Sequence, residues 1–173
     1  MLKNNIIYYS IVNKKNIKIA DTSQNNETKQ AQIVLKRMLD YFNLKMPEIE
    51  VSKDGKPFFK GSKIFFNYSH SKKYIACAIS LTEVGIDIEE TDRIISDRFA
   101  EKYLDGEKNF LKRIEKWVKK ESYSKLKGLG IQINFQNIKI EEIKENNHFI
   151  KQKDYMCSIY SYEKSMAFQE LKL

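Results

Sequence analysis

The sequence predicts an α+β fold made of two structurally similar halves. Each half reads, in order, as a strand, a helix and three further strands. The last hairpins of the two halves also resemble each other, with Ser71–Ala76 matched by Glu163–Ala167. Hydrophobic residues make up 42% of the chain and aromatic residues 12%, which is enough for a substantial core. We therefore expect halves at 1–81 and 82–173, packed as a pseudo-dimer.

The first half opens with a β-branched and aromatic segment, Ile6–Val12, which predicts a strand. A helix is predicted where Ala31, Val34, Leu35, Met38, Leu39 and Phe42 recur at helical spacing after the polar cluster Thr22–Asn26. The three strands that follow are expected at Ile49–Ser52, Lys63–Asn67 and Tyr74–Ser80, separated by a turn at Asp54–Phe59 and a polar loop at Tyr68–Lys73.

The second half begins with the apolar strand Val84–Glu89. A short helix is expected within Thr91–Tyr103, and a longer one from Phe110 to Lys127, stopped by Gly128-Leu129-Gly130. The closing strands are expected at Asn137–Ile143, Phe149–Ser161 and Met166–Leu171, with turns at Asn146-Asn147 and Tyr162–Lys164.

Charge and cysteine content restrict the surroundings and partners of the protein. The net charge of +8 and pI near 9.3 favour an anionic partner, such as a phosphorylated cofactor, an acidic protein or nucleic acid. Only Cys77 and Cys157 are present, both in apolar segments, which indicates buried, reduced thiols and a cytoplasmic protein. The first residues contain no long apolar run, so we expect neither a secretory signal nor a membrane span.

Two acids interrupt the apolar strand that opens the second half. Asp87 and Glu89 are two residues apart, so their side chains should point to the same face of the strand. Exposure beside surface lysines is the simpler explanation for such a pair. However, Gly85 indicates a close backbone approach at this strand, and parallel carboxylates repel unless a cation lies between them. Their hard oxygen atoms favour Mg²⁺, or alternatively Mn²⁺.

The longer helix carries Trp117, Glu121 and Lys125 at intervals of four residues, and therefore on one face. A Glu four residues before a Lys is also an ordinary surface pair. Trp117 argues for the interior, because a large aromatic side chain normally faces the core and would bring Glu121 inward with it. An inward carboxylate needs a partner, which a metal ion or Lys125 would provide.

Two neighbouring loops of the first half carry groups that suit a phosphate or a nucleotide. One contains Ser69 and His70, and the other contains Lys56 and Pro57. The sequence contains no arrangement typical of a hydrolytic triad, no Walker loop and no dinucleotide-binding glycine motif.

Four motifs occur in an order that resembles the 4′-phosphopantetheinyl transferases, in particular the surfactin-synthetase-activating type. They are Gly55-Lys56-Pro57, Phe66-Asn67-Tyr68-Ser69-His70-Ser71, Gly85-Ile86-Asp87-Ile88-Glu89 and Trp117-x-x-Lys120-Glu121-Ser122-x-x-Lys125. The resemblance implies two related α+β halves with coenzyme A in the cleft between them. It also implies transfer of phosphopantetheine to a serine of an acidic apo acyl- or peptidyl-carrier protein, with release of 3′,5′-ADP.

The same resemblance implies roles for individual residues. Asp87, Glu89 and Glu121 would hold Mg²⁺, Glu121 would also accept the serine proton, and Lys125 would contact the phosphate under attack. Ser69 and His70 would bind the nucleotide end of coenzyme A, and Lys56 with Pro57 would line the adenine pocket. The basic segment that this family places before its first helix is not recognisable here, and the candidates to replace it are Lys14, Lys15, Lys18 and Lys29.

Two other functions remain open at this point. A metal-dependent nuclease would also place acids near a lysine on a basic protein, although it leaves Ser69 and His70 unexplained. A non-catalytic relative that binds coenzyme A or a carrier protein is the second alternative. Because the expected cleft lies within one chain, we expect a monomer. We expect neither a membrane nor nucleic acid as a partner.

Overall fold

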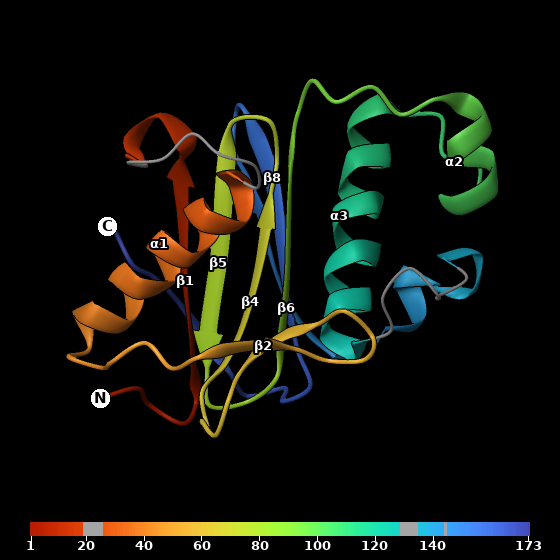
Figure 1. Cartoon of the computed structure of the whole chain (residues 1–173). Helices are drawn as coiled ribbons and strands as arrows, with labels where there is room; N and C mark the ends of the chain where they lie inside the picture. The colour runs from red at the N-terminus through yellow and green to blue at the C-terminus, as the bar shows by residue number, and fades with distance from the viewer. Residues whose placement is uncertain (19–25, 129–134, 144) are drawn as a thin grey trace.

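A computed structural model describes residues 1–18, 26–128, 135–143 and 145–173 of the chain (Figure 1). Helices and sheets both contribute, as the predicted α+β class requires. The helices are α1 (Asn26–Tyr41), α2 (Asp97–Tyr103) and α3 (Phe110–Lys127). The strands are β1 (Ile6–Asn13), β2 (Ile49–Val51), β3 (Pro57–Phe59), β4 (Phe65–His70), β5 (Tyr74–Ser80), β6 (Val84–Glu90), β7 (Asn146–Lys151), β8 (Tyr155–Ser161) and β9 (Ala167–Glu170).

The strands form two larger sheets and one short hairpin. The first sheet has the order β4-β5-β1-β9, the second has the order β6-β8-β7, and β2 pairs with β3 alone. Neighbouring strands are antiparallel except at one position, where β9 runs parallel to β1 with Ile6 opposite Ala167. The chain therefore returns to the first sheet at its last strand, after completing the second.

Figure 1 shows α1 crossing one side of the first sheet, while α3 lies on the far side of the second sheet, next to β6. Three cores follow from this arrangement. One fills the space between α1 and the first sheet, one lies between the two sheets, and the third joins α2 and α3 to the second sheet. The periodic face of α1 is buried as its spacing predicts, at Ala31, Val34, Leu35, Met38 and Leu39.

Strand β6 distributes its side chains between two neighbours. Val84, Ile86 and Ile88 are buried in the core between the sheets. Gly85, on the opposite face, meets α3 so closely that an added Cβ would lie 2.1 Å from the Ser122 carbonyl oxygen. The expectation of a close backbone approach at Gly85 is therefore confirmed, and this approach brings the helix against the strand.

Helix α3 begins and ends as its sequence predicts. The side chain of Asn109 accepts a hydrogen bond from the Lys112 amide at the N-terminus. Gly128 adopts a left-handed conformation, with φ of 67°, and caps the C-terminus. Leu129 and Gly130, the rest of the predicted exit, lie outside the described residues, as do residues 22–25 of the polar cluster before α1.

The closing strands depart from the prediction in two places. Asn137–Ile143 is not a strand, because only Ile138 becomes buried and short 3-10 turns form at Phe135–Asn137 and Ile140–Glu142. The three isoleucines of this segment, at 138, 140 and 143, are also compatible with such turns. Phe149–Ser161 is not one strand but parts of β7 and β8, joined by a turn at 152–154, so Asn146 and Asn147 lie in a strand rather than a turn.

Two corrections also apply to the first half. Pro57–Phe59, expected as part of a turn, forms β3 and pairs with β2 after a turn at Gly55, whose φ is 81°. Ser69 and His70, expected in a loop, are the last residues of β4, which pairs with β5 up to His70. Both segments form backbone hydrogen bonds to a neighbouring strand. Residue pairs typical of turns do not indicate such pairing, so the sequence did not predict it.

Two properties of the chain bear on its surroundings. Cys77 and Cys157 are free and buried, as expected. Among the described residues, no helix has the length and apolar character that a membrane crossing would need.

Candidate active site

Polar side chains connect the edge of the first sheet to the second sheet. Positions 67, 69 and 71 alternate along β4 and its end, so they share one face, and all three are buried. Each makes a hydrogen bond to β6. Asn67 Oδ1 accepts from the Ile86 amide (3.2 Å), Ser69 Oγ donates to Asp87 Oδ1 (2.7 Å) and Ser71 Oγ donates to Glu90 Oε1 (2.7 Å). Side chains, rather than a backbone ladder, therefore hold β4 beside β6.

Lys125 connects these strands to α3. Its Nζ donates to Asp87 Oδ1 at 2.7 Å and to Ser69 Oγ at 2.9 Å. One strand from each sheet and helix α3 thus meet at one ammonium group. The sequence placed Ser69 on the nucleotide side of the site and Asp87 on the metal side, and the structure brings both to Lys125.

Asp87 is only partly satisfied by these contacts. It is 4% exposed, and its Oδ2 is the single buried side-chain oxygen or nitrogen in the described part of the chain without a hydrogen-bond partner. An orphaned carboxylate oxygen in the interior costs about 1–3 kcal/mol or more. This oxygen therefore has the capacity to accept a cation or a proton donor.

Glu121 lies near Asp87 and is strongly affected by that position. Burial raises the pKa of its carboxyl from 4.5 to about 7, and the Asp87 charge adds to the increase. Lys125 and Arg93 oppose the shift without cancelling it. A carboxyl group that titrates near neutral pH suits proton transfer.

Glu89 has partners of its own. The Trp117 indole N–H donates to Glu89 Oε1 at 3.3 Å, and Arg93 forms an ion pair with the same oxygen. Trp117 faces inward, as its position on the helix predicts, and packs against Phe99 and Phe135. Glu89 is thus paired with an arginine that the sequence analysis did not single out.

His70 lies at the end of β4, half exposed. Its Nε2 is 3.4 Å from Glu27 Oε2, and the other oxygen of Glu27 accepts a hydrogen bond from Lys14 at 2.7 Å. Burial lowers the pKa of His70, and Glu27 opposes this effect. Glu27 therefore bridges His70, the predicted phosphate ligand, and Lys14, one of the four candidate basic residues.

Lys56 and Pro57 lie at the start of β3, over the C-terminus of α3. Lys56 Nζ donates to the Leu126 carbonyl at 3.3 Å and is 3.5 Å from Glu83 Oε2. Its aliphatic chain is 3.6 Å from the position that a Cβ on Gly128 would take. The β2–β3 hairpin is thereby fixed to the end of the helix.

Two adjoining cavities contain every residue predicted for the site. One of about 290 Å³ includes Lys56 and Pro57, and one of about 390 Å³ includes Ser69, His70, Asp87 and Glu89. Both are lined by Tyr68, Glu121 and Lys125. The result is a groove that runs from the β2–β3 hairpin, past Lys125, to the acids of β6.

Sequence reasoning missed Tyr68, which lies in β4 and lines both cavities rather than flanking a loop. It also missed Glu90, which is 5% exposed and accepts hydrogen bonds from the Lys72 and Lys73 amides at 3.2 and 2.6 Å, besides Ser71. The alternation of polar residues at 67, 69 and 71 was the signal that β4 carries a polar face toward a partner.

Comparison with known proteins places this groove in context. Residues 83–171 match the 4′-phosphopantetheinyl transferase superfamily. The chain belongs to this superfamily. It is 32% identical over 147 residues to the 4′-phosphopantetheinyl transferase gsp of Aneurinibacillus migulanus, which covers 76% of this chain and 60% of that protein. It is 29% identical over 145 residues to the 4′-phosphopantetheinyl transferase psf-1 of Bacillus pumilus, covering 75% and 62%. The chain thus spans about 60% of the length of these relatives.

The resemblance to this superfamily implies a divalent cation, and the residues present fit one in their chemistry. Asp87 Oδ2 lacks a partner, and Glu121 lies near it with a carboxyl that is costly to ionise alone. Oxygen ligands of this type suit Mg²⁺ or Mn²⁺. In the arrangement described, however, no three His, Cys, Asp or Glu side chains form a group that could hold a metal ion. Glu89, the third expected ligand, is bound to Arg93 and Trp117 instead.

Proposed function

We propose that this protein transfers 4′-phosphopantetheine from coenzyme A to a serine of an apo carrier protein. The observation that carries this proposal is Lys125, whose ammonium joins Ser69 to Asp87 in the middle of the groove. Lys56 and Pro57 line one of the two cavities that share Lys125, and Ser69, His70 and the acids of β6 line the other. Membership of the superfamily favours group transfer over the nuclease alternative.

In the proposed reaction, the serine oxygen forms a bond to the phosphorus that carries the pantetheine arm. The pyrophosphate P–O bond breaks, and 3′,5′-ADP leaves. The serine proton passes to Glu121, directly or through a water, and the pKa of about 7 matches that task. Lys125 compensates charge on the phosphate under attack.

Asp87, Glu89 and Glu121 are the proposed ligands of Mg²⁺, with Mn²⁺ as an alternative. A bound divalent cation would neutralise charge on the pyrophosphate oxygens. Ser69 and His70 are proposed to bind the nucleotide end of coenzyme A, and Lys56 with Pro57 the adenine.

The organisation of the chain supports the proposed two related halves, 1–81 and 82–173, packed as a pseudo-dimer. In each half the first strand pairs with the second strand of a hairpin: β1 with β5, which pairs with β4, and β6 with β8, which pairs with β7. Both arrangements are antiparallel. We also propose a monomer, a cytoplasmic location supported by two free buried thiols, and an acidic carrier protein as partner of a chain with net charge +8.

The test is to incubate the protein with coenzyme A, Mg²⁺ and a panel of apo carrier proteins from fatty-acid, polyketide and nonribosomal-peptide synthesis. We expect at least one carrier to gain the mass of one phosphopantetheine arm. Lys125→Met should abolish the gain. Lys127→Met is the matched control, because Lys127 pairs with Glu145 and packs against Tyr162 outside the groove. Coenzyme A binding by calorimetry without any mass gain would identify a non-catalytic relative, and the absence of both would overturn the proposal.

A further inference from the structure

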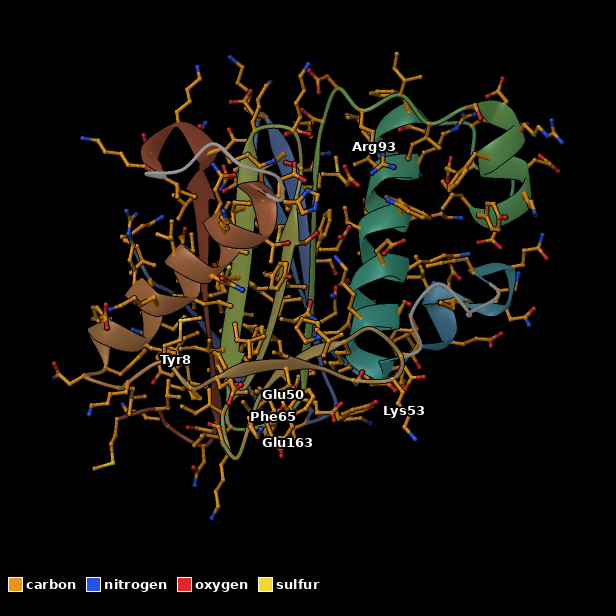
Figure 2. The ribbon with its side chains drawn as sticks, viewed as in Figure 1. Tyr8, Glu50, Lys53, Phe65, Arg93 and Glu163 are labelled. Atoms are coloured by element: carbon orange, nitrogen blue, oxygen red, sulfur yellow. The ribbon has the colours of Figure 1, made fainter. Side chains whose placement is uncertain are left out.

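Arg93 occupies the end of the groove where β6 leads toward α2. It follows Glu89 by four residues, and its guanidinium forms an ion pair with Glu89 Oε1. The same guanidinium lies 5.6 Å from the centroid of the Trp117 ring. Figure 2 shows Arg93 over α3, at the level of the upper turns of the helix. Arg93 thus contacts both the acid strand and the aromatic residue of the helix.

Glu89 Oε1 is held from two directions in this arrangement. The guanidinium is one partner, and the Trp117 indole N–H, at 3.3 Å, is the other. A guanidinium always carries its charge, and it is weakly hydrated compared with an ammonium, so it pairs readily with a carboxylate that is only 12% exposed. Two donors on one oxygen fix the direction of the Glu89 side chain.

The other two acids of the groove are less fully paired, although Asp87 Oδ1 accepts hydrogen bonds from Ser69 and Lys125. Asp87 Oδ2 has no hydrogen bond, and no hydrogen bond or ion pair of Glu121 is found among the described residues. Arg93 also lies near enough to Glu121 to act on it electrostatically. Arg93 therefore adds a positive charge, besides that of Lys125, where the groove has three carboxylates.

We propose that Arg93 is an internal counter-ion that competes with a divalent cation for Glu89. This inference rests on the proposed function, in which Asp87, Glu89 and Glu121 are the ligands. While the Arg93–Glu89 pair is closed, the three acids do not form a group that could hold a metal ion. Binding requires the pair to open, so that Glu89 Oε1 exchanges a guanidinium for the cation.

The surroundings permit this exchange. The Arg93 side chain is 40% exposed, so the guanidinium reaches solvent by rotating about its own side chain, without movement of the strand. Opening breaks one partly solvated ion pair. The free energy lost is small compared with the interaction between a divalent ion and three carboxylates. Arg93 therefore lowers the affinity for the cation without abolishing binding, and it balances the charge of Glu89 when the cation is absent.

Titration with Mn²⁺ tests the proposal without depending on catalysis. Bound Mn²⁺ is measured from the loss of the free-ion signal in electron paramagnetic resonance, for the wild type, Arg93→Met and Arg37→Met. Arg37, in α1, provides the same change in charge and side chain on the other sheet's helix. We expect Arg93→Met to bind Mn²⁺ five- to tenfold more tightly than the wild type, and Arg37→Met to bind within twofold. Thermal unfolding establishes that each variant is folded.

The outcomes separate this inference from the function on which it rests. Equal or weaker Mn²⁺ binding by folded Arg93→Met would overturn the role of Arg93. Asp87→Asn provides the second comparison, because it removes a proposed ligand that Arg93 does not contact. If Asp87→Asn binds Mn²⁺ as tightly as the wild type, the cation is not bound by these acids, and the ligand assignment fails together with the inference. If Asp87→Asn loses binding but Arg93→Met does not gain it, only the inference fails.

Discussion

Replacing Gly85 by alanine is a sharp test of how the groove is assembled. Gly85 faces α3, and an added Cβ would lie 2.1 Å from the Ser122 carbonyl oxygen, 2.4 Å from the Leu126 amide nitrogen and 2.9 Å from the Leu126 Cα. All three are backbone atoms of the helix, so no side-chain rotation relieves the contact. The methyl group fits only if α3 and β6 separate.

The size of that movement follows from the contacts. Ordinary Cβ contacts begin near 3.4 Å, so the carbonyl oxygen at 2.1 Å must move away by roughly 1.3 Å. Overpacking in a core typically costs about 1–3 kcal/mol, which in a protein of this size lowers Tm by roughly 3–10 °C. The same displacement separates Glu121 and Lys125 from Asp87. A misplacement of about 1 Å can reduce a catalysed rate by roughly 100-fold.

The assay combines thermal unfolding with the rate of carrier modification. Gly61→Ala is the control, because Gly61 also has no side chain but has nothing within 4 Å of an added Cβ. Its φ of 64° makes alanine cost about 1 kcal/mol, so stability should fall slightly and the rate should not change. Our account of the site would be refuted if Gly85→Ala retained both the Tm and the rate of the wild type.

Three further predictions concern acids at or near the groove. Burial raises the pKa of Glu121 to about 7, so above that pH the buried carboxylate destabilises the folded state relative to the unfolded state. Below about pH 4 the carboxyl is protonated in both the folded and the unfolded state, and this effect disappears. Without divalent cations, Glu121→Gln should therefore increase the free energy of unfolding at pH 8 by up to about 3 kcal/mol, seen as a higher Tm, and change it little at pH 4. A Tm that falls at pH 8 contradicts this. Glu90→Gln replaces an acceptor with a donor facing the amides of residues 72 and 73, and should cost about 1–3 kcal/mol in chemical unfolding, with faster amide exchange at Lys73. Glu27→Gln removes an anion that raises the pKa of His70, so NMR titration should give a lower pKa in the variant than in the wild type, and an increase would show that the Glu27–His70 contact does not form.

The sequence could predict much of the local structure around the groove. Alternation along β6 and four-residue spacing along α3 are properties of single elements, and they correctly indicate which faces carry Asp87, Glu121 and Lys125. Gly85 further indicated that something approaches this strand closely, and the structure shows that it is α3. Together these local signals predicted that β6 has a close neighbour and that Glu121 faces inward, and the structure shows that β6 and α3 meet.

Contacts between distant parts of the chain were harder to foresee. The hydrogen bonds from Ser69 to Asp87 and from Ser71 to Glu90 depend on the register of β4 against β6, which no backbone ladder fixes. The ion pair of Arg93 with Glu89 was also missed, although a spacing of four residues is common to such pairs in helices. Here the spacing spans the end of a strand and the loop that follows, where periodicity gives no guide.

The prediction of the closing strands was wrong for a related reason. Short apolar alternation predicts a strand only when a neighbouring strand is available, and the second sheet ends at β7 without one for residues 137–143. The parallel pairing of β9 with β1 joins segments about as far apart in sequence as the chain allows. Neither the composition of β9 nor the turn that precedes it indicates that β9 pairs with β1.

That pairing constrains how the protein gives access to its groove. The chain passes from the first sheet to the second before β6, and it passes back before β9, whose residues 167–170 hydrogen-bond along β1. Two covalent crossings and one shared sheet therefore join the described parts of the two sheets. We therefore expect access to the groove to depend on side chains in its walls, such as Arg93 and Tyr68, more than on separation of the two sheets.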